Sequence, residues 1–144
     1  MKHMVETKDW KESYLRKIRS IQENLKSVKE WMAETNLEAF LRDKKTRFAV
    51  FKAFQEVVET CMDLAAMLVK DRGIPPKDDY KNLETLREEK VLSDKMEDIL
   101  SEANGLPNWI IHRYNNLDDA EAYREIQKLI APVEDFIGVV KKWI

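Results

Sequence analysis

Residues 9–32, DWKESYLRKIRSIQENLKSVKEWM, decide the fold class. Apolar side chains recur through this stretch at steps of three and four residues, at Trp10, Tyr14, Ile18, Ile21, Leu25, Val28 and Met32. That spacing places them on one face of an α-helix whose other faces are charged. The stretch therefore predicts a long amphipathic helix, from about Asp9 to Met32, that buries one stripe against other elements.

The same pattern returns three times. Asp43 is placed to cap a second long helix, which Gly73 and the prolines of DRGIPP, residues 71–76, should end. Ser93 caps a third helix, and Asp118, with a glutamate three residues later, caps the last one. The last helix carries the apolar stripe Tyr123, Ile126, Ile130, Val133, Ile137, Val140 and Ile144.

Two short helical pieces complete the prediction, at residues 37–41 after Asn36 and at residues 82–89. Pro132 lies inside the last helix and should kink it. Four long amphipathic helices without a strand pattern favour an all-α fold. We predict one domain over residues 1–144, an up-and-down four-helix bundle with short extra helices.

Composition narrows the class of protein. Hydrophobic residues make up 44% of the 144 residues and charged residues 36%, and the formal net charge is -2. Because basic residues are not in excess, contact with nucleic acid would need a local patch of basic residues or a groove formed when chains assemble. The single cysteine, Cys61, has apolar neighbours, which favours a buried side chain in a reducing compartment. We expect a cytoplasmic protein, because no apolar run is long enough to span a membrane.

Familiar catalytic and metal-binding patterns are missing. His3 and His112 are the only histidines, and there is no HExxH motif, cysteine pair or glycine-rich phosphate loop. We therefore expect no metal and no cofactor. Lys44, Lys45 and Arg47 form a small basic group that fits either a phosphate contact or ordinary surface. The tryptophans on the first and last helices fit either tertiary packing or contact with a second chain.

One stretch, NGLPNWIIHRYNNLDD at residues 104–119, is unusual for a solvated helix end. If it is helical, Asn108 and His112 share a face, which Asn115 and Asn116 continue by another turn. This face is too polar for a core, and it is richer in amides than a plain solvent face. Imidazole titrates near neutrality and can act as general base and general acid. By residue chemistry alone, a lone histidine near a helix end is more often structural than catalytic.

The spacing Asn108-x-x-x-His112-x-Tyr114 resembles the signature of the HEPN superfamily, and more closely that of its HepT-like branch. That branch carries Arg-Asn-x-x-x-His-x-Tyr near the end of the third main helix, often with a glycine before it and an aspartate after it. Gly105 and Asp118 match those two positions. The order of the helices agrees as well, so the resemblance covers about residues 10–144.

The resemblance implies a helical homodimer with two copies of the motif in a cleft at the interface. It implies a metal-independent ribonuclease, with His112 as general acid and base and Asn108 as its support. It further implies a toxin–antitoxin system, in which a minimal nucleotidyltransferase of the MntA type is the partner. In the family this antitoxin attaches AMP to the motif tyrosine, which is Tyr114 here.

The chain departs from the family at Pro107, where the motif has its arginine. Proline carries no charge for a phosphate and lacks a backbone donor, which favours a kink or a helix restart. With Asn104 as a cap, Pro107 would fall in the first turn of a new helical piece. Arg113 is a candidate for a replacement phosphate contact, although it points elsewhere on a helix than position 107. We hypothesise that cleavage is weakened or lost.

Three interpretations remain open at this stage. The first is an RNA-cleaving toxin of the HepT kind. The second is a non-catalytic HEPN dimer that binds a nucleotidyltransferase or a nucleotide, which Pro107 favours. The third is an unrelated four-helix adaptor. Retention of Asn108, His112 and Tyr114 together favours the first.

Overall fold

The structure is a computed structural model that describes the backbone of residues 2–111 and 116–144, and the side chains of residues 9–106 and 119–144. These parts contain helices and no strand. The helices are α1 (Lys2–Ala33), α2 (Leu37–Arg42), α3 (Lys44–Asp71), α4 (Asp79–Glu88), α5 (Asp94–Ile111) and α6 (Asn116–Lys142). The prediction of four long helices with two short ones is confirmed.

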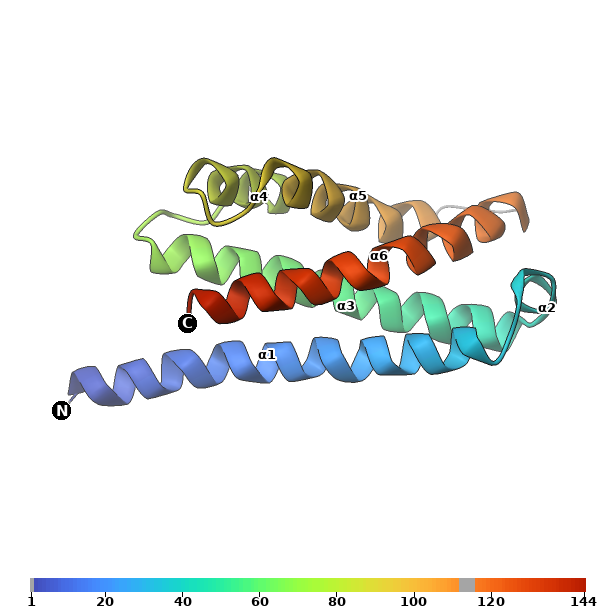
Figure 1. Cartoon of the computed structure of the whole chain (residues 1–144), viewed down its shortest axis with the longest axis horizontal. Coiled ribbons are helices and arrows are strands. Elements are labelled where there is room, and N and C mark those ends of the chain that lie inside the picture. Colours follow the sequence, from blue (N-terminus) through green and yellow to red (C-terminus); the bar gives the residue numbers. More distant parts are fainter. Residues whose placement is uncertain (1, 112–115) are drawn as a thin grey trace.

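The four long helices run up and down along one axis (Figure 1). α1 runs away from the N-terminus, α3 returns beside it, α5 runs out again and α6 leads back to the C-terminus. The short α2 lies at the end of the bundle where α5 ends and α6 begins, and it packs against both α3 and α6. We call this the motif end, and the end with α4 and both termini the distal end. No helix of the described residues is long and apolar enough to cross a membrane.

Capping side chains set several helix starts. Asn36, Asp43 and Ser93 each accept a hydrogen bond from the backbone N–H three residues later, at 2.9, 3.1 and 3.0 Å. These three caps confirm the predicted starts of α2, α3 and α5. Because Asp43 also ends α2, these two helices are joined through a single residue.

Three boundaries differ from the prediction. α1 begins at Lys2 and not near Asp9, since residues before the apolar stripe extend the helix. α4 begins at Asp79, because Asp78 accepts a hydrogen bond from the backbone N–H of Lys81 at 2.9 Å. α6 begins at Asn116, so the predicted cap at Asp118 is wrong and this residue falls within the first turn.

The two internal prolines do not divide their helices. α5 is one helix from Asp94 to Ile111, so the predicted restart at Pro107 with Asn104 as its cap is wrong. Asn104 instead lies within α5 and donates to the Asp79 carboxylate at 3.4 Å. Proline at position 107 leaves the carbonyl four residues earlier, at Ala103, without its helical donor. α6 likewise continues through Pro132.

The buried side chains form one continuous core in two parts. The part at the distal end joins α1, α3 and α6 around Tyr14, Leu64 and Phe136, and the part at the motif end contains Phe40 and Phe54. The predicted stripes of α1 and α6 are buried as expected, except that Trp10, Ile130 and Ile144 are only partly buried. Near helix ends, the apolar side chains of Phe48, Trp31 and Trp143 are 55%, 37% and 42% exposed. Cys61 is buried, as its apolar neighbours predicted.

Candidate functional site

The motif residues lie where α5 ends and α6 begins. Pro107 and Asn108 belong to the last turns of α5, and only their backbone is described. The predicted catalytic residue His112, the candidate phosphate contact Arg113 and the candidate AMP acceptor Tyr114 lie outside the described residues. The site is therefore defined by the surfaces that surround this segment.

An aromatic cluster supports the motif end from inside. Phe40 of α2 is fully buried and packs edge-on against Phe51 of α3, with ring centroids 5.5 Å apart. It also packs against Tyr123 of α6, at 4.8 Å. This cluster joins the corner between α2 and α3 to the first turns of α6.

A charged contact lies beside this cluster. The Arg47 Nε atom is 3.4 Å from the Asp119 Oδ2 atom, and the two side chains are only 15% and 10% exposed. Arg47 also donates through Nη1 to the carbonyls of Phe40, at 3.4 Å, and of Leu41. Sequence reasoning placed Arg47 in a surface basic group, and in the structure its guanidinium is turned inward instead.

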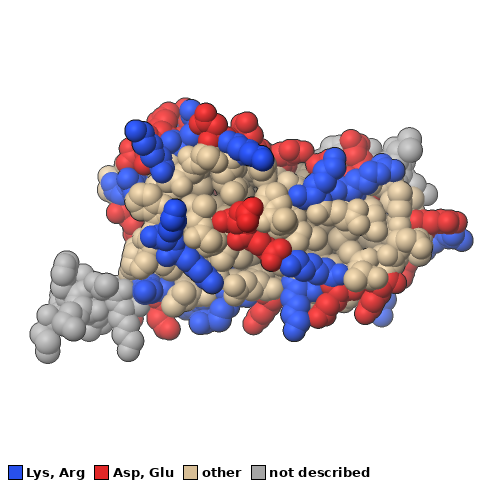
Figure 2. Space-filling model, viewed as in Figure 1, with Lys and Arg blue, Asp and Glu red and all other residues tan. Residues whose placement is uncertain are grey.

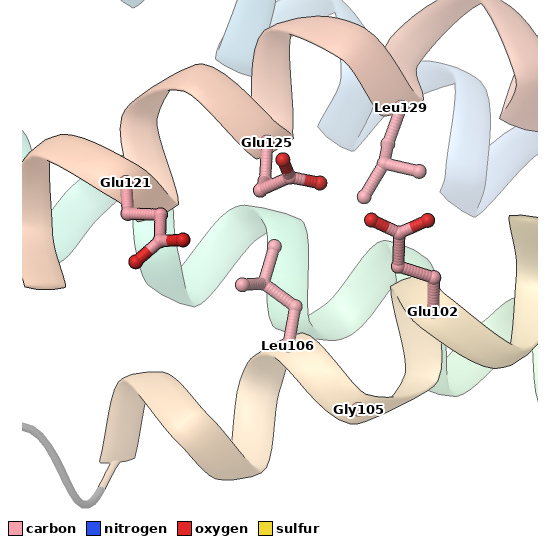
Figure 3. Close-up of a pocket in the computed structure, with 6 residues that line it drawn as sticks. All are labelled: Glu102, Gly105, Leu106, Glu121, Glu125 and Leu129. Carbon is pink, nitrogen blue, oxygen red and sulfur yellow. The ribbon is translucent and has the colours of Figure 1, made fainter.

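On the other flank of the motif, α5 and α6 enclose an acidic groove of about 300 Å³. Its lining includes Glu102, Glu121 and Glu125, together with Leu106 and Leu129 (Figure 3). The Glu102 and Glu125 carboxyl groups point toward each other, and their hydrogen bond raises the pKa of Glu102 above its usual range. A groove of this charge repels phosphate.

Charge on the rest of the surface is mixed. On the face that α1 and α6 present, basic and acidic side chains are interspersed (Figure 2). Lys44 and Lys45 remain exposed at the start of α3, and the Lys44 ammonium lies 5.3 Å from the centre of the Phe48 ring. Within the described part of the chain, no group of three or more His, Cys, Asp or Glu side chains is arranged to hold a metal ion. Lys44 and Lys45 are exposed cations beside the corner between α2 and α3.

The comparison with family models decides the assignment. Residues 21–140 match the model described as "Ribonuclease HepT-like". The chain belongs to the HepT-like ribonuclease family. A relative from Archaeoglobus fulgidus named "Putative RNase" is 35% identical over 131 residues, which cover 91% of this chain and 92% of the relative. A second relative of the same name and organism is 38% identical over 104 residues, or 72% of this chain and 79% of the relative.

Solved structures confirm the fold of this family member. A tri-AMPylated HEPN toxin of Shewanella oneidensis, solved in complex with its MNT antitoxin, superposes with a TM-score of 0.81 at 22% identity. The match covers 90% of this chain and 96% of the toxin. A cytosolic protein of unknown function from Bacillus subtilis superposes with a TM-score of 0.75 at 16% identity, over 92% of this chain and 89% of that protein. The resemblance inferred from the motif and the helix order is thus confirmed.

Sequence reasoning missed two features of the site. The Arg47–Asp119 pair carried a signal, because each residue continues an apolar stripe by one turn: Arg47 precedes Phe51 by four residues, and Asp119 precedes Tyr123 by four. A charged residue on each of two core faces, with opposite signs, indicates a buried pair. The acidic groove carried a weaker signal, since glutamates at positions 121 and 125 share a helix face but Glu102 comes from another helix.

Proposed function

We propose that this chain is the toxin of a toxin–antitoxin pair and cleaves RNA as a homodimer. The family match over residues 21–140, which contains the whole motif, carries this proposal. Asn108, His112 and Tyr114 stand at the spacing of the family signature. The proposed partner is a minimal nucleotidyltransferase of the MntA type. The Shewanella oneidensis toxin of the same fold is AMPylated and bound to an MNT antitoxin, which supports Tyr114 as the AMP acceptor.

The proposed chemistry needs two proton transfers and no metal. His112 of one subunit takes the proton of a ribose 2′-hydroxyl, and the freed oxygen attacks the adjacent phosphorus. The bond from phosphorus to the 5′ oxygen breaks, and His112 of the other subunit donates a proton to that oxygen. The products are a 2′,3′-cyclic phosphate and a free 5′-hydroxyl. Asn108 orients the imidazole or holds a phosphate oxygen, and Arg113 is the candidate phosphate contact.

The charges around the motif favour one direction of approach for RNA. Glu102, Glu121 and Glu125 make the groove between α5 and α6 repulsive to phosphate. The exposed Lys44 and Lys45 lie on the side of α2 and α3. We therefore propose that the RNA backbone enters over the corner between α2 and α3.

The test is cleavage of RNA by the purified protein in the presence of a chelator. We expect slow cleavage by the native chain and a loss of about 10²–10⁴-fold in His112→Ala, the usual contribution of general acid–base catalysis. Pro107→Arg should cleave faster, because it restores positive charge for the phosphate in the transition state. Pro107→Ala is the matched control, since it restores the backbone N–H to α5 without adding charge.

The outcomes separate the interpretations. If Pro107→Arg cleaves RNA and the native chain does not, the native protein has the toxin fold but has lost ribonuclease activity. If Pro107→Ala gains as much as Pro107→Arg, helix continuity and not charge limits the native site. If none of the four proteins cuts RNA, the ribonuclease proposal fails. The non-catalytic dimer, which Pro107 favours, then becomes the better account, and binding of the nucleotidyltransferase is its test.

A further inference from the structure

The Arg47–Asp119 pair is the least exposed ion pair between residues whose side chains are described. The Arg47 Nε atom is within ion-pair distance of the Asp119 carboxylate, at 3.4 Å, but it has no aligned hydrogen-bond partner. The contact is thus mainly an attraction between charges, and it operates where water screens it little. It links the first turn of α3 to the first turn of α6.

The same guanidinium also holds α2. Its Nη1 atom donates to the carbonyls of Phe40 and Leu41, which lie in the last turn of α2. The Phe40 carbonyl also accepts from the backbone N–H of Asp43, at 3.3 Å. Arg47 therefore contacts three helices at once. We call Arg47, Asp119 and these two carbonyls the corner contact.

The corner contact is not needed for stability alone. Removing a carboxylate and a guanidinium from water is costly, and apolar residues of similar volume often stabilise a fold equally well. In some proteins a buried polar or ionic group instead fixes one arrangement of the elements that it joins. Asp119 follows the start of α6 at Asn116 by three residues, and His112 precedes that start by four.

We propose that Arg47 and Asp119 are positioning residues that fix where the chain enters α6 and so hold the motif segment in place. This inference rests on the proposed ribonuclease function for its effect on catalysis. Arg47 is not a substitute for the arginine missing at position 107. Its guanidinium is buried and is already bound to two carbonyls and a carboxylate. The corner contact acts through the backbone of α6 and not on the phosphate.

Hydrogen exchange tests the positional claim without depending on RNA cleavage. The variants are Arg47→Met, Arg47→Lys and Asp119→Asn, measured under conditions where each remains folded. We expect exchange in peptides covering residues 107–119 to rise roughly tenfold in Arg47→Met and Asp119→Asn, because the start of α6 opens locally. Arg47→Lys keeps the positive charge but loses the planar guanidinium that donates to several acceptors at once. Its exchange rate at residues 107–119 should therefore be intermediate between that of these two variants and that of the native chain. The exchange rate of peptides from α4 should stay at its native value.

Arg87→Met is the matched control. Arg87 forms the other ion pair with a largely buried partner, since its Nε atom lies 2.8 Å from Glu97 and links α4 to α5 at the distal end. Its loss should lower overall stability without a selective change in residues 107–119. If exchange at residues 107–119 in Asp119→Asn stays at the native rate, or rises there no more than in Arg87→Met, the positional claim is overturned.

The second readout uses whichever background, native or Pro107→Arg, cleaves RNA. We expect kcat to fall by about 10²-fold in Asp119→Asn, the effect of a small misplacement of catalytic groups, with KM nearly unchanged. A rise in KM at constant kcat would overturn the positioning role, since it would indicate an RNA-binding contact. If no background cleaves RNA, the ribonuclease proposal fails by itself, and the exchange result still decides whether the corner contact holds the segment.

Discussion

At each end of the bundle a carboxylate joins two helices, but the groups that it contacts differ. At the distal end, the Asp71 carboxylate accepts hydrogen bonds from the Trp10 indole and the Tyr14 hydroxyl, which pack edge-on with centroids 5.1 Å apart. At the motif end, the aromatic rings of Phe40, Phe51 and Tyr123 lie in the core, and the carboxylate of Asp119 pairs with Arg47.

The difference lies in what each carboxylate joins. Asp71 is exposed to water and connects α1 with α3, two neighbouring helices that pack side by side. Asp119 is buried and connects the first turn of α6 with the corner between α2 and α3. The first contact adds to the stability of an interface that exists without it. The second determines where a helix begins, next to the proposed catalytic segment.

The largest effect on stability is expected from Phe40→Ala at the motif end. Phe40 is fully buried between α3 and α6, so its truncation should lower the free energy of unfolding by about 3–5 kcal/mol. Urea denaturation followed by circular dichroism measures this. Phe48→Ala is the control, because Phe48 is 55% exposed and its loss should stay within about 0.5 kcal/mol. Equal losses in the two variants would contradict the aromatic cluster as the support of this end.

Asp71→Ala should have the next largest effect, at the distal end. It leaves the buried Tyr14 hydroxyl without its acceptor, and we expect a loss of about 2 kcal/mol. RNA cleavage measured well below the unfolding temperature should be unchanged. Asp63→Ala removes an exposed carboxylate of the same helix, paired with Lys17 at 3.1 Å, and should cost less than about 1 kcal/mol. A change in RNA cleavage by Asp71→Ala would contradict the proposal that contacts at the distal end affect stability alone.

The smallest effect is expected from Tyr14→Phe, with a cost of about 1 kcal/mol at neutral pH. Burial, and then the hydrogen bond to Asp71, raise the pKa of Tyr14 above its usual value. The folded chain therefore keeps the phenol proton when the unfolded chain loses it, near pH 10. Stability of the native protein should be complete below that pH and fall as the pH rises above it. In Tyr14→Phe this part of the alkaline loss should disappear, and an unchanged pH profile would contradict the assignment.

Much of the fold follows from local rules that are visible in the sequence. The stripe from Trp10 to Met32, the caps at Asp43 and Ser93 and the stop after Gly73 each depend on residues close together in the chain. Helix starts that lie outside the apolar stripes were misplaced, as at Lys2 and Asn116.

The site was predictable only in part, for a different reason. The spacing of Asn108, His112 and Tyr114 is a sequence property, so the motif could be recognised. The inward turn of Arg47 depends on Asp119, which lies 72 positions further along the chain. The continuity of α5 through Pro107 was likewise not visible in the sequence, where proline favoured a restart. Interactions of this range cannot be read from local spacing.

The single cysteine makes the protein a convenient host for spectroscopic probes. Cys61 is 1% exposed, and burial raises the pKa of its thiol to about 12. The native side chain is therefore protonated and shielded, and thiol-directed labels react with the thiolate. A cysteine placed at an exposed position of the corner between α2 and α3, such as Lys45, would carry a spin label or a fluorophore with no need to replace the native residue. In a symmetric assembly of two chains, the distance between the two labels would be twice the distance of position 45 from the symmetry axis.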